Sequence, residues 1–330
     1  MRRIFLLFLF TSPCCILFGQ NSWFCSDSSF CTSGVTNQSP SRGIVLSFEQ
    51  LPGLELESKN DDESLIARLE DSRQIKFKIK APVLNKKSIK MLLGFRYSDE
   101  RLNFTALGEN RELFSYLNDK RFKSTGLDLY VMKPFKGNAY LTFGFGVGLH
   151  GDFKGLLKTN SRFINYSGGF LIAKKPNKDL EYGFGLVYSK KYGFGSFPIP
   201  VIKYDHTLSS KFGVETMLPY KVHFRYNISE HNMIRVGMSG KSSSYNIGLN
   251  ELSGYENASL KFSRTYIQYG LTFDQQIVHP LWLSISAGYQ QNVSFNIRET
   301  FTKGDYLLNS NADGAPYFNF TLFLTNPKKK

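Results

Sequence analysis

Apolar and polar residues alternate along most of the chain after residue 43. From Ala139 to His150, leucine, phenylalanine and valine recur at every second position, while threonine, glycine and histidine occupy the positions between them. Residues 180–189 repeat this pattern. Successive side chains of a strand point to opposite faces, so each segment is predicted to be a strand with one apolar face and one small or polar face.

The same alternation recurs throughout the chain and predicts an all-β fold. Turn-forming residues separate the strands, and Phe135 to Asn138 and Asn227 to Asn232 predict two hairpins. Apolar residues at helical spacing between Glu109 and Arg121 predict one short helix within a loop. The predicted strands are 43–50, 74–80, 88–98, 124–134, 139–150, 163–174, 180–189, 198–208, 211–217, 220–228, 231–241, 243–250, 258–273, 281–297 and 316–325.

Strand length favours a membrane barrel over a soluble β-sandwich, which also has one apolar face. Many predicted strands alternate over about nine residues or more, enough to cross a bilayer when tilted, whereas soluble strands average about five or six. Since every backbone group in hydrocarbon must be paired, the predicted fold is a closed antiparallel transmembrane β-barrel of about 12 strands (about 10 to 14). Tyrosines near strand ends suit an aromatic girdle: Tyr97, Tyr130, Tyr188, Tyr192, Tyr204 and Tyr289.

The two ends of the chain differ from the barrel. Residues 1–20 have a basic start, a short apolar stretch and a small residue, Gly19, near their end, which predicts a cleavable signal peptide. Residues 21–42 are rich in Ser, Asn, Thr and Gly and are predicted to be a flexible periplasmic lead-in. The barrel is assigned to 43–325 and a basic tail to 326–330. With no later apolar run long enough for a spanning helix, we expect a protein of the cell outer membrane.

Net charge and cysteine content limit the classes of partner and cofactor that the chain is expected to bind. A net charge of +14 suits nucleic acid, an anionic membrane surface or an anionic solute, and the predicted export excludes nucleic acid. The expected partners are outer-membrane lipid and lipopolysaccharide, the barrel-assembly machinery and small solutes. In an oxidising compartment, Cys25 and Cys31 can form a small disulfide loop. Two thiols without a nearby histidine do not make a metal site, and no cofactor is expected.

Basic residues recur on the polar face of several predicted strands. Because a lipid-facing cation costs about 2 to 4 kcal/mol at mid-bilayer, these side chains are predicted to face the lumen, where they favour anionic solutes. The alternative is a structural ladder in which they pair with Glu181, Glu215 and loop acids across the barrel. Glycines on the lumen side of the strands also have two explanations. They can let a ligand approach the wall closely, or they can permit the strands to curve. The candidate lumen cations are Lys76, Lys78, Lys80, Lys90, Arg96, Lys221, His223, Arg225 and Arg235, and the glycines are Gly144, Gly146, Gly148, Gly183 and Gly185.

Two local pairs invite an enzymatic interpretation, since acid–base catalysis often uses a histidine with a carboxylate. Asp205 and His206 are adjacent on a strand, so they point to opposite faces and cannot readily hydrogen-bond to each other. His150 and Asp152 share a face near a strand end, but no nucleophile motif accompanies them. We therefore expect no enzyme activity and assign no catalytic residue.

Four stretches carry a family resemblance. They are Thr125 to Lys136 (TGLDLYVMKPFK), Gly144 to Phe153 (GFGVGLHGDF), Tyr182 to Tyr204 (YGFGLVYSKKYGFGSFPIPVIKY) and Phe212 to Asn227 (FGVETMLPYKVHFRYN). With them, the chain from about Gly43 to Leu324 resembles a family of outer-membrane β-barrels found in the Bacteroidota and known only as a domain of unknown function. The resemblance implies an outer-membrane barrel and supplies no catalytic or binding residues.

The predicted function is a passive pore or uptake channel for small solutes, anions among them. A structural or surface-interaction barrel without transport is the alternative, and an outer-membrane barrel enzyme is less favoured. A pore conducts in a planar lipid bilayer and a structural barrel does not, so conductance distinguishes the first two.

Overall fold

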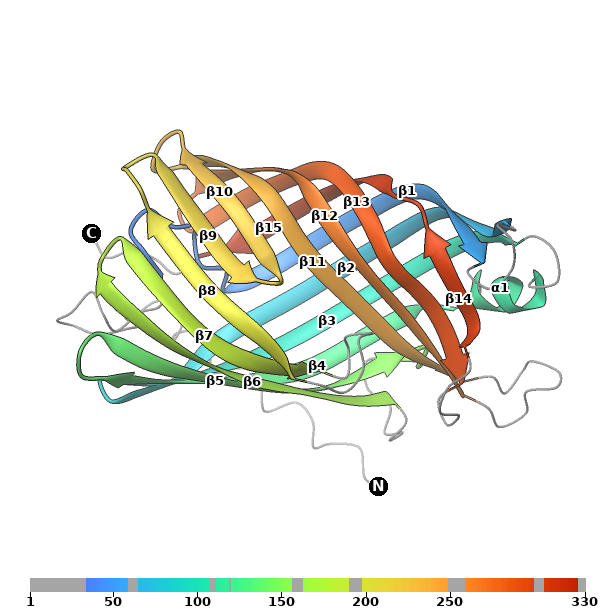
Figure 1. Ribbon diagram of the computed structural model, residues 1–330, viewed down its shortest axis with the longest axis horizontal. Coiled ribbons are helices and arrows are strands. Elements are labelled where there is room, and N and C mark those ends of the chain that lie inside the picture. Colours follow the sequence, from blue (N-terminus) through green and yellow to red (C-terminus); the bar gives the residue numbers. More distant parts are fainter. Residues whose placement is uncertain are drawn as a thin grey trace, which may run out of the picture.

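The computed structural model describes residues 34–58, 65–106, 111–118, 120–155, 163–189, 198–248, 259–299 and 306–325. Within them, each strand from β1 to β13 pairs antiparallel with the next, and the last two strands pair with both β13 and β1, which closes the sheet into a barrel (Figure 1). The last two strands, β14 and β15, both lie between β13 and β1 and share one of the fourteen positions of the wall. The strands are β1 (Ile44–Ser58), β2 (Leu65–Lys86), β3 (Ile89–Ala106), β4 (Phe122–Phe135), β5 (Ala139–Gly151), β6 (Ile164–Asn177), β7 (Leu180–Ser189), β8 (Ile199–Thr207), β9 (Phe212–Leu218), β10 (Lys221–Asn227), β11 (Asn232–Gly248), β12 (Ser259–Val278), β13 (Leu281–Glu299), β14 (Tyr306–Ala312) and β15 (Ala315–Leu324).

The described residues form a barrel of 14 strands, so the expected number of about 12 is wrong. The predicted strands 231–241 and 243–250 are a single strand, β11, because its small and polar residues 240–244 keep pairing with β12 instead of turning. β1 and β2 are longer than predicted, since they continue past the regions of simple alternation. The all-β class, the two hairpins and the loop helix, α1 (Arg111–Asn118), are confirmed.

The connections make the two ends of the barrel different. At the turn end, short turns join the strands, and Asn138 adopts a φ of 61°, which asparagine tolerates. At the loop end, the connections are longer and include α1, except for the tight β9–β10 turn at 219–220. In outer-membrane barrels the short turns face the periplasm. The turns of the turn end are 87–88, 136–138, 178–179, 208–211, 228–231 and 279–280.

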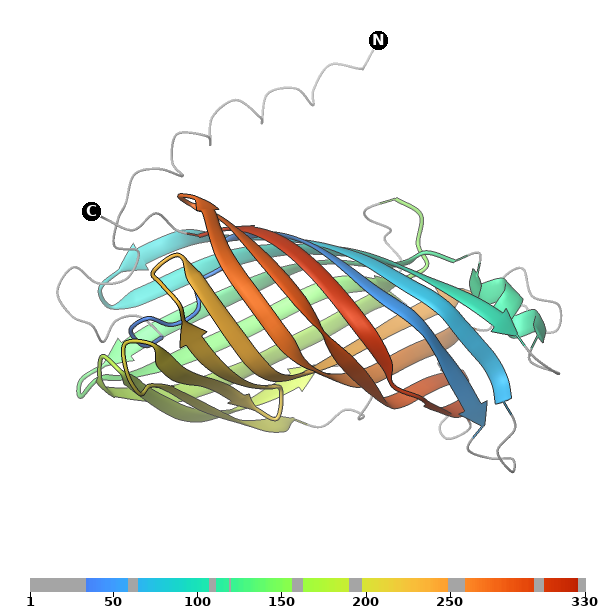
Figure 2. The ribbon, with the colours of Figure 1, turned by 90° about the horizontal axis from the view of Figure 1, so that it is seen from above.

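An apolar belt surrounds the outside of the barrel, whose strands run obliquely to its long axis (Figure 2). Every strand position contributes at least one large apolar or aromatic side chain that is 37 to 64% exposed. A continuous exposed apolar band is unfavourable in water and matches the lipid-facing surface of a membrane barrel. One member from each position is Leu46, Ile75, Leu93, Leu127, Phe143, Ile172, Phe184, Ile202, Leu218, Phe224, Val236, Leu271, Tyr289 and Phe320.

A hydrophobic core fills the interior at the loop end. Phe122 packs on Phe262 with ring centroids 5.4 Å apart, and Phe262 packs on Phe295 at 5.0 Å, although β4 lies far from β12 and β13 in the wall. The helix α1 adds Phe114, which is fully buried and lies 5.1 Å from Phe104. We call this the loop-end core. Its members are Leu51, Leu54, Leu56, Ala67, Leu69, Leu102, Phe104, Phe114, Leu117, Phe122, Tyr245, Ile247, Leu260, Phe262, Phe295, Ile297, Ala315 and Tyr317.

The neighbour of β11 changes along its length. β10 pairs with β11 as far as Ser239, and the backbone N–H of Gly240 donates to the Tyr220 carbonyl at 2.8 Å. Further along, Asn246 pairs in parallel with Gly151 of β5. In the described residues, β11 therefore pairs with β10 toward the turn end and with β5 toward the loop end.

The lumen-side glycines differ in how closely the wall packs against them, which yields a prediction. A Cβ on Gly185 would lie 1.9 Å from the Phe170 carbonyl oxygen, whereas a Cβ on Gly144 meets nothing closer than Tyr130 at 3.5 Å. Gly185→Ala is expected to cost about 1–3 kcal/mol, as overpacking does. Urea unfolding followed by heat-dependent gel mobility measures this, with Gly144→Ala as control; equal midpoints would contradict the close packing.

Candidate solute chamber

Two cavities lie inside the barrel between the loop-end core and the turn end. The first has a volume of about 510 Å³ and is lined by strands from β2 to β9. The second has a volume of about 260 Å³ and is lined by β1, β2 and strands from β10 to β15. Lys78 on β2 lines both, so the two cavities adjoin. We call them together the solute chamber.

The second cavity is strongly basic. Five lysine and arginine side chains line it, together with His223, but Glu49 is its single carboxylate lining residue. Glu49 is 6% exposed and accepts from Lys241 at 2.7 Å and from Gln268 at 3.0 Å. Because β1 and β11 are not neighbours, the Glu49–Lys241 pair crosses the lumen. The five are Arg42, Lys76, Lys78, Arg235 and Lys241.

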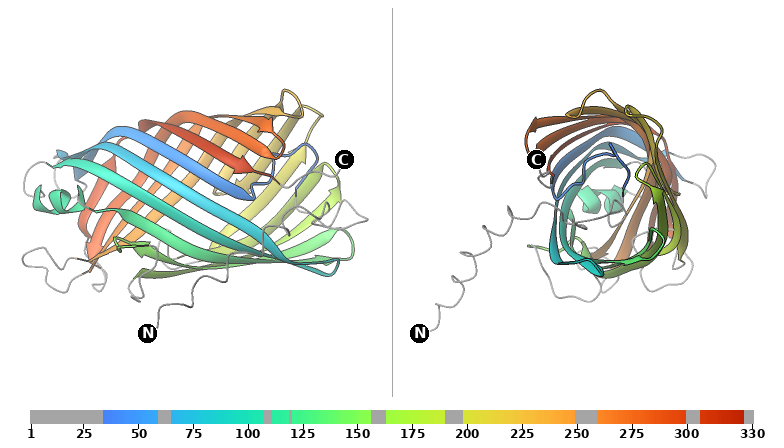
Figure 3. Two further views of the ribbon diagram at one scale, coloured as in Figure 1. Left: turned by 180° about the vertical axis from the view of Figure 1, so that it is seen from behind. Right: turned by 90° about the vertical axis from the view of Figure 1, so that its left-hand side faces the viewer.

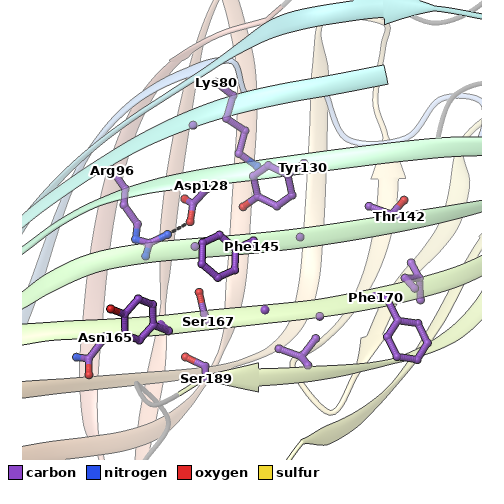
Figure 4. Close-up of a pocket in the computed structure, with 18 of the residues that line it drawn as sticks. Lys80, Arg96, Asp128, Tyr130, Thr142, Phe145, Asn165, Ser167, Phe170 and Ser189 are labelled. Atoms are coloured by element: carbon purple, nitrogen blue, oxygen red, sulfur yellow. Dashed lines mark hydrogen bonds and ion pairs between the residues drawn. The ribbon is translucent and has the colours of Figure 1, made fainter. Parts of the chain in front are cut away.

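The first cavity combines charged, polar and apolar walls. Arg96 and Asp128 form an ion pair there, and the Lys80 ammonium lies 4.8 Å from the Tyr130 ring centroid (Figure 4). Around them lie the polar side chains of Asn165, Ser167 and Ser189, which Figure 4 shows along β6 and β7. An apolar strip completes the wall, formed by Leu171 of β6, Val187 of β7, Val201 of β8 and Met217 of β9.

Most of the predicted lumen cations have partners within the barrel. Five of the nine pair with carboxylates: Lys76 with Glu49, Arg96 with Asp128, Lys221 and Arg225 with Glu215, and Arg235 with Asp274. Lys80 lies over Tyr130, and the His223 Nε2 is 3.0 Å from Ser239 Oγ. Lys78 lines both cavities, and Lys90 is buried on β3. These contacts match the structural ladder, while the second cavity keeps an excess of cations.

Several charged lumen residues were missed by sequence reasoning. Lys203 pairs with Glu181 at 2.6 Å, Lys241 with Glu49 at 2.7 Å, and Arg264 with Glu100 at 2.5 Å. Lys241 falls where the pattern predicted a break between two strands. The alternation of Val201, Lys203, Asp205 and Thr207 on one face of β8 is the signal that would have found Lys203.

A segment before β1 closes the turn end of the chamber. Residues 34–42, which we call the strap, run from β7 to β1, and these strands lie on opposite sides of the ring (Figure 3, right). Gln38 Nε2 donates to Asp205 at 3.2 Å, and the Ser39 N–H and Oγ donate to Glu215 Oε1 at 2.9 and 2.8 Å. Arg42 Nη2 donates to Asp274 at 3.3 Å. These residues, which belong to the predicted lead-in, therefore contact buried acids of the barrel wall.

The two pairs of residues considered for catalysis lie on β8 and at the end of β5. Asp205 is buried and accepts from the Thr216 N–H at 3.0 Å, whereas the His206 Nδ1 lies 3.1 Å from the exposed Tyr204 hydroxyl, so the two point to opposite faces. Asp152 accepts from the Gly248 N–H at 3.3 Å. In the described residues, no three His, Cys, Asp or Glu side chains are grouped to hold a metal ion.

The remaining predictions lie largely outside the described part of the chain. Cys25 and Cys31, the signal peptide and the basic tail fall outside it. None of the helices in the described ranges combines the length and apolar character needed to cross a membrane.

Comparisons with known proteins identify one matching family. A family described as a domain of unknown function (DUF6268) matches residues 55–324, and no curated protein matches the sequence. The fold is similar to an outer membrane channel from Pseudomonas putida F1, at 9% identity and a TM-score of 0.45 over 88% of this chain and 99% of that one. It is also similar to a Pseudomonas aeruginosa FadL homologue, at 10% identity and a TM-score of 0.39 over 86% and 90%. Likenesses this distant carry no functional argument, and the Bacteroidota origin stays a prediction.

Proposed function

The chain belongs to the family of the domain of unknown function DUF6268, a description that carries no activity, and we propose that it is an outer-membrane channel for small anionic solutes. The apolar belt on every strand position supports membrane insertion. The short turns then face the periplasm, together with the strap. We also propose that the barrel is not an enzyme and that its partners are outer-membrane lipid, the assembly machinery and the transported solute.

The observation that carries the proposal is the charge of the second cavity. Five cationic side chains line this cavity, and the two carboxylates that pair with four of them, Glu49 and Asp274, leave an excess of positive charge in the lumen. Low-dielectric walls focus such a field and concentrate anions within it. A purely structural ladder would match each cation with its own carboxylate, whereas in the second cavity Glu49 pairs with both Lys76 and Lys241, and Asp274 pairs with both Arg42 and Arg235.

The geometry favours a gated channel over a permanently open pore. The loop-end core fills one end of the lumen with buried aromatic and aliphatic side chains, and the strap crosses the other. A structural barrel with a sealed lumen is the second candidate, and this closure is the observation that favours it. The two candidates differ in whether ions cross once the strap is released.

Selectivity tests the channel proposal. The double variant Lys78→Gln with Arg96→Gln removes two lumen cations and leaves Asp128 without its ion pair. Since Coulomb attraction at 4 Å in water is about 1 kcal/mol, the anion-to-cation permeability ratio is expected to fall about fivefold. Reversal potentials in a salt gradient measure it, best in the strap-released protein described in the Discussion.

Lys133→Gln is the matched control, because Lys133 is exposed on the outer face of β4. It removes one positive charge outside the lumen and should leave the ratio unchanged. A double variant as anion-selective as the unchanged protein would contradict the proposal.

A further inference from the structure

Two carboxylates at the second cavity are each shared by two cations. Lys76 of β2 and Lys241 of β11 lie 3.3 and 2.7 Å from the same oxygen atom of Glu49. Asp274 has a cation on each of its oxygens, at 3.3 and 2.7 Å. Since one carboxylate balances one cation, each group keeps a net positive charge. The two cations on Asp274 are Arg42 and Arg235.

Hydroxyl groups form much of the remaining wall of the second cavity. Ser47 Oγ lies 2.8 Å from Thr321 Oγ1, and Thr272 Oγ1 lies 2.9 Å from Ser286 Oγ. A hydroxyl can rotate to donate to an anionic oxygen, and such charge-assisted bonds are about twice as strong as neutral ones. The hydroxyl side chains that line the cavity are Ser47, Ser239, Thr272, Ser286, Tyr317 and Thr321.

The size of the second cavity limits its ligand. Its volume of about 260 Å³ lies below the range of about 300 to 1,000 Å³ that is typical of sites for drug-sized molecules. Cationic and hydroxyl side chains make up most of its wall. The cavity therefore suits a small, multiply charged oxyanion better than a larger organic molecule.

The strap supplies one of the cations. Arg42 lines the second cavity, where its Nη2 donates to Asp274 Oδ1 and to Ser284 Oγ, both at 3.3 Å. Its guanidinium carbon lies 4.4 Å from the ring centroid of Phe323 on β15. The Arg235 guanidinium binds the other oxygen of Asp274, so one carboxylate lies between a guanidinium of the strap and one of the wall. The site is therefore complete only while the strap is in place.

Resting on the proposed function, we propose that the second cavity binds a doubly charged oxyanion of the phosphate or sulfate type, and that this anion holds the strap closed. Four cations paired with two carboxylates leave two positive charges, which a dianion balances. The bound anion bridges the strap and the wall. Its cationic ligands are Arg42 of the strap and Lys76, Arg235 and Lys241 of the wall.

Closure of the strap and binding of the anion then reinforce each other. Release of the strap removes Arg42 from the site, so the anion binds the closed protein more tightly. For an anion that binds only the closed protein, a concentration of about 100 times its dissociation constant favours the closed strap about a hundredfold. The proposed channel therefore closes when dianions are abundant and opens when they are scarce.

Ion titrations test the site. Sulfate, inorganic phosphate and chloride are titrated at constant ionic strength into the full-length protein in lipid nanodiscs, with protein-free nanodiscs as the blank. Chloride, with one charge, is expected to bind at least about tenfold more weakly than sulfate or phosphate. Arg42→Gln and Lys241→Gln should each weaken sulfate binding about fivefold, because each removes one charge from the site.

Lys211→Gln is the matched control for both variants. Lys211 is exposed on a turn at the same end of the barrel, so its loss should leave sulfate binding unchanged. Normal heat-dependent gel mobility identifies the variants that are folded. Equal affinities for sulfate and chloride, or unchanged sulfate binding in folded Arg42→Gln and Lys241→Gln proteins, would overturn the dianion site.

Hydrogen exchange in the strap, followed by mass spectrometry, tests the coupling. The backbone N–H groups of Thr36 and Ser39 donate to the Lys178 carbonyl and to Glu215 when the strap is closed. Saturating sulfate is expected to slow their exchange about tenfold or more, and chloride is not. Arg42→Gln should abolish this slowing, whereas the Lys211 control should retain it. Sulfate binding without slower exchange would overturn the coupling.

The same measurements separate this proposal from the proposed function. Absence of sulfate binding in a protein whose reversal potentials still show anion preference would overturn the dianion site and leave the channel standing. Sulfate binding with slower strap exchange in a protein without anion preference would support the dianion site and overturn the proposed function alone.

Discussion

Releasing the strap is expected to open the barrel. The triple variant Thr36→Gly, Gln38→Gly and Ser39→Gly removes three side-chain hydrogen bonds, to Asp179, Asp205 and Glu215. Hydrogen bonds to charged groups are worth about 1.5–3 kcal/mol each, so even a combined loss of about 3 kcal/mol shifts the bound-to-released ratio of the strap about a hundredfold. Single-channel recording in planar bilayers should show rare openings in the unchanged protein and frequent openings in the variant.

The control is Ser41→Gly, at an exposed strap position. It should leave the open probability unchanged. A silent triple variant whose heat-dependent gel mobility is normal would rule out a channel and favour the structural barrel. Frequent openings in the unchanged protein would show that the strap does not close the turn end.

Breaking the buried pair at the loop end is expected to destabilise the barrel strongly. Arg264 on β12 and Glu100 on β3 lie 2.5 Å apart across the lumen, with side chains 4% and 1% exposed. Arg264→Met leaves the Glu100 carboxylate buried without its cation, while Tyr245 continues to donate to it at 2.8 Å. Removing one partner of a buried pair typically costs about 3–5 kcal/mol. Urea unfolding, followed by heat-dependent gel mobility, measures the loss.

An exposed pair supplies the comparison. Arg68 and Glu55 lie 3.0 Å apart with side chains 55% and 41% exposed, so Glu55→Ala should cost about 0–1 kcal/mol. If both variants unfold at the same urea concentration, the Arg264–Glu100 pair does not hold the loop end together.

Alternation together with strand length was sufficient to predict the closed barrel and which face of many strands is lipid-facing. A period of two assigns Phe143 and Phe145 to one face and Gly144 and Gly146 to the other, and the barrel places the first pair outside. Local turn chemistry likewise placed the hairpin at Phe135 to Asn138, because Asn138 tolerates a positive φ. These features depend on neighbouring residues alone.

The residues that line the chamber depend on which strands lie opposite each other across the lumen. Only the tertiary structure determines this arrangement. Glu49 and Lys241, or Phe122 and Phe262, meet because closure of the sheet and the stagger of its strands bring them across the lumen. The neighbour of β11 changes from β10 to β5 because β10 ends while β11 continues, although the sequence of β11 has no mark of this change. The segment that contains the strap was predicted to be flexible because its Ser, Thr and Asn residues have no apolar pattern. In the barrel, acids on β7, β8, β9 and β12 bind the strap. Composition predicts how a segment behaves alone, whereas a partner 140 or more residues away in the sequence is fixed only by the closed barrel.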